Sequence, residues 1–153
     1  MIEINKISKS FDNHKIIEDI SATFDKGKTN LIIGQSGSGK TVLMKCLLGL
    51  HEVDKGDILY NGKKFNKDEI SDVSNLRKQM GMVFQGSALF DSMSVLDNII
   101  FPLRMFSNMS QSKMIERARE VIHRVDLKDV DNKFPSEISG GMKKRVAIAR
   151  AIV

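Results

Sequence analysis

Alternating apolar and polar residues mark the first part of the chain as strand-forming. Apolar residues recur in Ile2 to Ile7 and in Ile16 to Phe24, and the polar turn Asp12-Asn13-His14 separates the two stretches. This pattern predicts two strands joined as a hairpin. Leu31 to Ile33 is a short apolar run without alternation, which is typical of a strand buried on both faces of a parallel sheet.

Helices and strands are expected to follow one another after that run. Thr41 to Leu50 is rich in apolar residues and stops near Gly49, so it predicts a helix covered by its neighbours. Asp57 to Tyr60 lies between two turn-forming pairs and predicts a strand. Met80 to Phe84 predicts a further buried strand, preceded by a helix over Val73 to Lys78. The pattern indicates an α/β chain.

From Val95 onward the apolar spacing becomes helical. A helix is expected over Leu96 to Phe106, interrupted or restarted at Pro102, because proline removes a backbone donor and clashes one turn back. Ser110 is the expected cap of the next helix. Six apolar residues form one face of that helix: Met114, Ile115, Ala118, Val121, Ile122 and Val125. Met142 to Val153 is the last expected helix, so this part should be a helical subdomain.

Composition narrows the class of protein. The chain has 153 residues, of which 41% are hydrophobic, and this is enough for one domain with a sizeable core. Cys46 is the single cysteine, which excludes an intramolecular disulfide and fits a reducing compartment. No apolar run approaches the roughly 18 residues that a membrane span needs. The first residues also lack the continuous apolar region of a secretory signal peptide. The cytosol is therefore the expected location.

The charge balance is basic but does not predict a nucleic-acid partner. The chain carries 24 Lys and Arg residues against 19 Asp and Glu residues, a net charge of +5. These charges are interleaved along the chain, and the densest cluster is only Lys143-Lys144-Arg145. Most of the excess is expected on solvated surface, and we expect no nucleic-acid binding.

A glycine-rich loop between the predicted strand and helix carries the strongest chemical signal. Its residues match the phosphate-binding loop pattern: Gly34, Gln35, Ser36, Gly37, Ser38, Gly39, Lys40 and Thr41. Glycines let consecutive N–H groups curl around phosphate oxygens, and the helix N-terminus adds its positive dipole. Lys40 can reach the β- and γ-phosphates, and Thr41 can offer its hydroxyl to Mg²⁺. The alternative is an ordinary glycine-rich turn, but the strand–loop–helix context favours nucleotide binding.

A second anion cradle is predicted where the last helix begins. Ser139 can cap this helix, and the adjacent Gly140 and Gly141, followed by Met142, permit close approach by a phosphate. The cations at 143–145 oppose the helix dipole unless they raise the local potential for an anion. A capped amphipathic helix with a solvated basic face explains this motif equally well when it is taken alone.

Together with Val83-Phe84-Gln85, these motifs resemble the nucleotide-binding subunit of ATP-binding cassette (ABC) transporters over the whole chain. The resemblance implies that residues 34–41 are the Walker A loop and that Gln85 is the Q-loop glutamine. It also implies that residues 139–142 are the signature sequence, which here ends in Met142 rather than the commoner Gln. Phe11 falls where the family places its adenine-stacking aromatic. Without the family pattern, Phe11 is more often plain core and Gln85 a surface amide.

The resemblance also implies roles, cofactors and a fold. ATP and Mg²⁺ would be bound, with Lys40 and Gln85 acting in catalysis and Thr41 and Gln85 on the metal. The fold would be an α/β P-loop NTPase (RecA-like) core with an N-terminal antiparallel β subdomain, a helical subdomain and an incomplete parallel sheet. Residues 1–153 would form one domain, divided into the β subdomain and P-loop core (1–85), the helical subdomain (86–138) and the signature helix (139–153).

A finer match is to the subgroup that serves Mce- or Mla-type lipid transport. Four segments carry it: Gly34–Lys45, Phe84–Val95, Phe101–Arg104 and Ser139–Arg145. The family implies a homodimer in which the signature of one subunit contacts the γ-phosphate held by Lys40 of the other. It further implies membrane permease subunits, an Mce-domain lipid-binding subunit and a place on the inner face of the cell membrane. Residues 87–105 would dock the permease; alternatively, their apolar side chains pack the helical subdomain.

The family pattern continues past the signature helix with a buried strand ending in Asp-Glu and with a later histidine. The pair Asp68-Glu69 follows polar residues, and His14, His51 and His123 lie too early, so none can take these roles. We therefore expect a chain truncated before Walker B that binds ATP better than it hydrolyses it. Its open sheet edge would make it prone to aggregation. The function classes are an energising ATPase subunit for lipid transport, and a non-hydrolysing nucleotide-binding module or remnant of a truncated gene. A P-loop kinase or GTPase leaves residues 139–142 unexplained.

Overall fold

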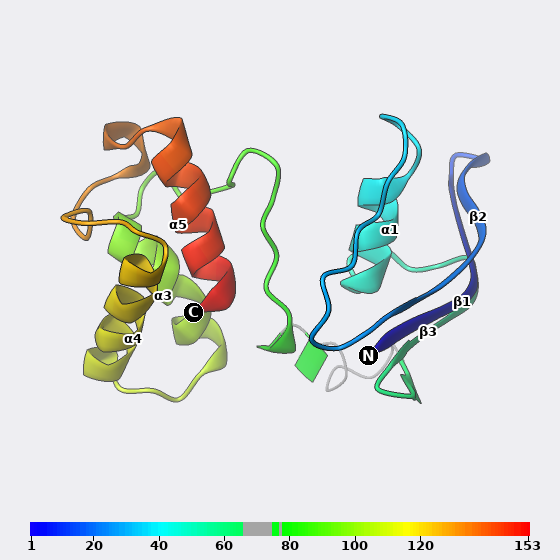
Figure 1. Ribbon diagram of the computed structural model, residues 1–153, viewed down its shortest axis with the longest axis horizontal. Helices are drawn as coiled ribbons and strands as arrows, with labels where there is room; N and C mark the ends of the chain where they lie inside the picture. Colours follow the sequence, from blue (N-terminus) through cyan, green and yellow to red (C-terminus); the bar gives the residue numbers. More distant parts are fainter. Residues whose placement is uncertain (66–74, 77) are drawn as a thin grey trace. The chain divides into compact units, whose positions relative to one another are not determined.

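The computed structural model describes residues 1–65, 75–76 and 78–153 (Figure 1). The chain divides into two compact units, Met1–Arg77 and Lys78–Val153, and each is described by itself. This division does not test the segments 1–85, 86–138 and 139–153, which remain predictions. None of the helices in the described ranges has the length and apolar character that crossing a bilayer requires.

The first unit begins with the predicted hairpin. Strands β1 (Ile2–Phe11) and β2 (His14–Phe24) pair antiparallel, and Phe11 is opposite His14 at the tip. Asp12 and Asn13 form the two-residue turn with φ of 47° and 64°. Two successive left-handed residues match the right-handed twist of the strands, and Asp and Asn tolerate this conformation. The hairpin is confirmed.

Two further strands complete an antiparallel sheet in the order β2-β1-β3-β4. β3 (Lys55–Tyr60) pairs with β1, and the short β4 (Lys63–Lys64) pairs with β3. The strand predicted over Asp57–Tyr60 is therefore confirmed. The turn after it contains Asn61 and Gly62, both at positive φ.

Helix α1 (Lys40–Leu47) lies against one face of this sheet (Figure 1). The core between them consists of buried apolar residues from the helix and three strands: Ile4, Ile7, Ile17, Leu43, Cys46, Leu47 and Ile58. Gly49 ends the helical segment with φ of 63°, as predicted. The Tyr60 hydroxyl donates a hydrogen bond to the Leu47 carbonyl, which fixes the C-terminal end of α1 to β3.

The second unit is a bundle of three helices (Figure 1). They are α3 (Val95–Phe106), α4 (Gln111–Arg124) and α5 (Gly140–Ile152), and the 3-10 turn η1 covers Pro135–Glu137. α3 continues through Pro102. The predicted face of α4 is confirmed, because Ala118, Val121 and Ile122 are buried in the bundle core. Helix spacing in the sequence therefore located all three helices.

Two predicted strands are wrong. Leu31 and Ile33 are 80% and 85% exposed, and Val83 and Phe84 are also exposed. Neither segment is a strand, and every ladder among the described residues is antiparallel. An apolar run becomes a buried parallel strand only where strands pair with both of its edges. The predicted helix over Val73–Lys78 falls largely outside the described residues, as does the pair Asp68-Glu69.

Candidate functional site

The loop before α1 has the backbone shape of a phosphate cradle. Gly37 and Gly39 have φ of 82° and 88°, and the Ser38 N–H donates to the Gln35 carbonyl at 3.2 Å. A Cβ atom on Gly39 would lie 2.8 Å from the Ile16 carbonyl oxygen and 2.9 Å from Ile17 Cγ2. Only glycine fits a left-handed residue packed this closely against β2. The sequence thus folds the loop tightly while residues 34–38 stay exposed.

Lys40 closes this loop from the first turn of the helix. Its ammonium donates hydrogen bonds to the carbonyl oxygens of Gly34 at 2.8 Å and Gln35 at 2.6 Å. The first turn of α1 contains no acidic residue, and its cap, Gly39, has no side chain to satisfy the free N–H groups. These N–H groups and a nearby cation favour an anion at this end of the helix.

The residues present fit a nucleoside triphosphate with its Mg²⁺. The exposed loop supplies backbone donors, Lys40 supplies a positive charge, and Thr41 is exposed beside them. The described parts of the chain contain no group of three or more His, Cys, Asp and Glu side chains that could hold a metal. A magnesium ion here would therefore be held mainly by phosphate oxygens and water, with Thr41 as a hydroxyl ligand.

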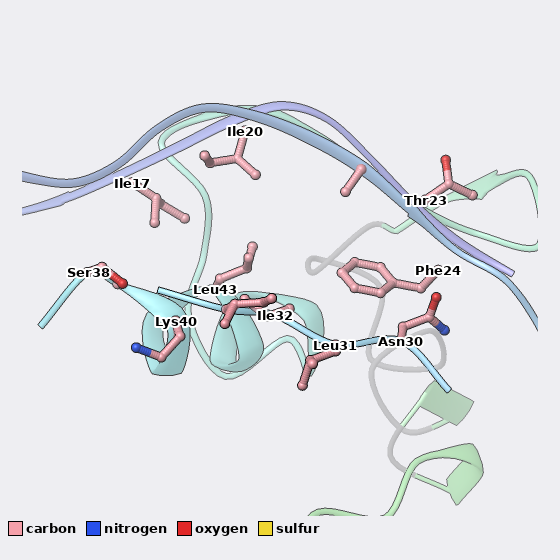
Figure 2. A pocket seen from close by; sticks show the side chains of 13 residues that line it. Ile17, Ile20, Thr23, Phe24, Asn30, Leu31, Ile32, Ser38, Lys40 and Leu43 are labelled. Carbon is pink, nitrogen blue, oxygen red and sulfur yellow. The ribbon is translucent and has the colours of Figure 1, made fainter. Parts of the chain in front are cut away.

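A cavity of about 410 Å³ extends from this loop beneath β2 (Figure 2). Ile17 and Ile20 point from β2 toward Ile32 and Leu43, and Lys40 lies at one end with its amine turned away from them (Figure 2). The walls are mostly apolar side chains, which do not compensate phosphate charge. A triphosphate therefore belongs on the exposed side of the loop, and not in this cavity.

Phe11, the predicted adenine-stacking residue, is 39% exposed at the hairpin tip. The alternative that it is plain core is therefore wrong. One edge contact is made with His51, with ring centroids 5.3 Å apart, and the Lys9 ammonium lies 5.2 Å from the Phe11 centroid. Much of the ring stays accessible, so it can stack on a flat partner.

Asp54 organises the strand end that carries Phe11, a role that the local sequence pattern does not predict. It accepts hydrogen bonds from the Lys9 ammonium and from the Ser10 N–H, both at 2.7 Å. The hydrogen bond from Lys9 makes the largest contribution to lowering the pKa of the Asp54 carboxyl, and the hydrogen bond from Ser10 lowers it further. Asp54 reaches β1 because β3 begins next to it and pairs with β1, a contact that local pattern does not reveal.

The second cradle has a different internal structure. Ser139 caps α5 by accepting a hydrogen bond from the Met142 N–H at 3.3 Å, as predicted. Gly140 and Gly141 are exposed and do not have positive φ. A Cβ atom on Gly140 would meet nothing within 4 Å, and one on Gly141 only Ser139 Oγ at 3.9 Å. A capped amphipathic helix explains the serine, but nothing in the unit requires the two glycines.

Gln85 is exposed in a turn of the second unit. The Ser87 N–H donates to the Phe84 carbonyl at 3.0 Å and closes this turn. The P-loop belongs to the first unit, so the expected action of Gln85 on the bound metal and phosphate stays a prediction. The same holds for the expected contact of residues 139–142 with a γ-phosphate.

The predicted docking segment, residues 87–105, contains both exposed and buried apolar residues. Phe90 is 40% exposed and packs against Phe101, with centroids 4.8 Å apart, and Met105 is 60% exposed. Ile99 and Ile100, by contrast, are buried in the bundle core. Packing of the subdomain therefore accounts for part of the segment and leaves an exposed aromatic group.

One buried polar residue in this region, Asn98, was not predicted from the sequence. Asn98 is fully buried on α3, and its side-chain oxygen accepts from the Phe90 N–H at 2.8 Å. Its amide nitrogen donates to the carbonyls of Phe90, Met93 and Ser94 at 3.0–3.1 Å. A polar residue inside an apolar helical stretch was the signal that could have identified it.

Cys46 carries no chemistry in this arrangement. The thiol is buried under the sheet, and desolvation raises its pKa, an effect that the charge of Lys9 partly opposes. A thiol held protonated in an apolar core is a poor nucleophile and metal ligand.

Known proteins with similar sequences place the chain in a family. The sequence pattern described as ABC transporter matches residues 17–153. The chain is 38% identical over 152 residues to the "Probable ribonucleotide transport ATP-binding protein mkl" of Mycobacterium tuberculosis, covering 99% of this chain and 42% of that one. It is 43% identical over 155 residues to "Protein TRIGALACTOSYLDIACYLGLYCEROL 3, chloroplastic" of Arabidopsis thaliana, covering 100% and 44%. It is 39% identical over 152 residues to the "Methionine import ATP-binding protein MetN" of Clostridium tetani, covering 99% and 48%.

The fold comparison agrees with the sequence comparison. A solved dimeric structure of the ATP-binding cassette MJ0796, bound to ADP and Pi, superposes with a TM-score of 0.90 at 27% identity, covering 99% of this chain and 69% of that one. The expected P-loop NTPase fold with an N-terminal antiparallel sheet and a helical part is confirmed. The chain spans less than half the length of the three relatives named above. On these matches, the chain belongs to the ABC transporter family.

Proposed function

We propose that this chain is an ATP-binding part of an ABC transporter and that it binds Mg-ATP on the exposed side of the P-loop. The observation that carries the proposal is the loop itself, in which left-handed glycines, a helix N-terminus without acidic residues and Lys40 converge. This combination has little other chemical use than holding phosphate.

Residues 37–41 of the loop, together with Gln85 and Phe11, have separate tasks in this proposal. The N–H groups of residues 37–41 bind phosphate oxygens, and the Lys40 ammonium moves from the carbonyls of Gly34 and Gln35 to the β- and γ-phosphates. Thr41 and Gln85 would add side-chain ligands to a magnesium ion held mainly by phosphate oxygens and water, and the ion would supply positive charge to the phosphates. The exposed face of Phe11 stacks on the purine.

We also propose that two copies of the chain share the nucleotide. The signature residues 139–142 of one copy would contact the γ-phosphate held by Lys40 of the other. Gly140 and Gly141 support this, because nothing within their own unit requires glycine, whereas close approach of a phosphate does. A solved relative of similar fold is described as dimeric.

Lipid is the proposed cargo of the transporter. Support comes from the likeness of the motifs to Mce- and Mla-type ATPases and from one relative whose name refers to a glycolipid. Other relatives are named for ribonucleotide transport and methionine import. In this proposal, Phe90 and its neighbours bind a permease at the inner face of the cell membrane, and an Mce-domain subunit carries the lipid.

Titration calorimetry with ATP, ADP and GTP, each with and without Mg²⁺, tests the binding proposal. ATP should bind with micromolar affinity and more tightly with Mg²⁺. Phosphate release, measured on the same samples, separates an ATPase from a non-hydrolysing nucleotide-binding module. The absence of any saturable nucleotide binding would contradict the proposed function.

Photocrosslinking in cells that carry the whole transport system tests the docking proposal. A crosslinking amino acid at Phe90 should capture a permease subunit, because this ring is exposed on the predicted docking segment. The same probe at Glu116, an exposed position on α4, is the control and should capture none. Uptake of fluorescent phospholipid, compared with uptake of methionine by the same cells, tests the cargo.

A further inference from the structure

The segment around Gln85 is attached to the last turn of α5 on both sides of that residue. Before it, a Cβ atom on Gly81 would lie 1.9 Å from the Ala151 carbonyl oxygen, so the two backbones touch. After it, the Arg150 guanidinium donates to the Ala88 carbonyl at 2.9 Å and to the Ser87 carbonyl at 3.0 Å. Two adjacent helical residues therefore contact the chain on both sides of Gln85, through backbone packing at Gly81 and through hydrogen bonds at Ser87 and Ala88.

This loop needs to be held, because its backbone is intrinsically unfavourable. Gly86, Ser87 and Ala88 have φ of 85°, 70° and 46°. Serine and alanine rarely adopt the left-handed region, and such residues persist only where neighbouring contacts compensate. Arg150 binds the carbonyls of two of these three residues, Ser87 and Ala88.

The surroundings of Arg150 show that the contact is more than a surface hydrogen bond. Ser87 is only 6% exposed, and the guanidinium carbon lies 5.8 Å from the centre of the Phe90 ring. Partial burial lowers the pKa of Arg150, although a guanidinium stays protonated at any physiological pH. The planar fork suits two neighbouring carbonyls and an aromatic face, whereas a lysine ammonium supplies only a point charge.

We propose that Arg150 is a positioning residue that makes Gln85 and Phe90 move with helix α5. The signature residues form the first turn of the same helix, about 15 Å away along a rigid element. A displacement of the signature would therefore shift the Q-loop turn and the exposed aromatic together. The part played by nucleotide rests on the proposed function above; the attachment itself does not.

Amide hydrogen exchange without nucleotide tests the attachment. Arg150→Met replaces the guanidinium with an unbranched apolar side chain. Exchange at residues 84–90 should then accelerate roughly tenfold to a hundredfold, because two charge-assisted hydrogen bonds are lost. Arg145→Met is the matched control, since Arg145 lies on the same helix and donates to a different carbonyl, that of Asp126, at 2.7 Å. It should leave residues 84–90 unchanged.

Arg150→Lys keeps the test decisive if the methionine variant does not fold. This variant retains the charge without the fork and should give intermediate exchange, at least threefold faster than the parent. Exchange at residues 84–90 that equals the parent in a folded Arg150 variant would overturn the proposal.

A second measurement separates this inference from the proposed function. In the parent, Mg-ATP should change exchange at residues 84–90, and in Arg150→Met this response should disappear while ATP affinity stays within twofold. A response that persists in Arg150→Met, or a parent that binds ATP without any response, overturns the transmission through Arg150. A parent that does not bind ATP contradicts the proposed function instead, and the nucleotide-free exchange still decides whether Arg150 holds the loop.

Discussion

Glycine is present at the starts of helices α1 and α5 for different structural reasons. At the start of α1, Gly39 is required by the protein's own fold, because its φ is positive and β2 lies within 3 Å of any side chain. At the start of α5, Gly140 and Gly141 have ordinary φ and free space around them. The first cradle is therefore built by internal packing, whereas the second keeps space for something outside its own unit.

Gly39→Ala should have the largest effect on the first cradle. The variant combines a left-handed alanine with a Cβ atom 2.8 Å from the Ile16 carbonyl, so we expect a loss of about 3 kcal/mol in free energy of unfolding. Urea denaturation followed by circular dichroism measures it. Gly37→Ala is the matched control, since Gly37 has a similar φ but open space, and it should lose only about 1–2 kcal/mol. Equal losses would show that packing against β2 is irrelevant.

Lys40→Ala should lower ATP affinity roughly a hundredfold, because a charged donor to phosphate is lost. Its present hydrogen bonds go to exposed carbonyls of the loop, so the free energy of unfolding should change little. Calorimetric titration with Mg-ATP measures the affinity. Lys45→Ala, in the last turn of the same helix, is the control and should bind ATP as the parent does. Unchanged ATP affinity in Lys40→Ala would contradict the assignment of this loop as the phosphate-binding site.

Ser139→Ala should destabilise the second unit by about 1 kcal/mol, because the side chain that accepts the Met142 N–H is lost. Thermal unfolding measures this change. Ser110→Ala is a useful comparison, because Ser110 occupies the same position on α4 without making a capping hydrogen bond. Its effect should be smaller, and the reverse order would contradict the capping geometry.

Gly141→Ala should have the smallest effect on stability and the opposite sign. Alanine is a better helix former, and its Cβ meets only Ser139 Oγ at 3.9 Å, so we expect a gain of about 0.5 kcal/mol. Nucleotide-dependent association of two copies, followed by sedimentation, should nevertheless weaken. A destabilised variant would show that Gly141 serves its own unit after all, and the contrast between the cradles would disappear.

Local sequence pattern was sufficient for the features that local physics controls. The Asp12-Asn13 turn, the spacing of apolar residues on α4 and the Ser139 cap depend on residues a few positions apart, and all three are present. The P-loop was predictable because its eight residues are consecutive in the sequence, although the packing of Gly39 against β2 was not.

Features that depend on distant partners were missed or wrong. Leu31–Ile33 has the composition of a buried strand, but composition does not supply the neighbours that a ladder needs. Arg150 lies more than sixty positions from the carbonyls that it binds, so no local pattern could link them. Asp54 was missed likewise, because strand pairing alone brings it to Ser10.

The fully buried amide of Asn98 has a consequence for molecular recognition. It fixes the backbone on both sides of the bend between Phe90 and Ser94, so this exposed aromatic ring is presented by a chain that has already lost much of its conformational freedom. Association with a rigid loop forfeits less entropy than association with one that must first become ordered. A partner that binds Phe90, as proposed above for a permease, would therefore reach a given affinity through a smaller contact area.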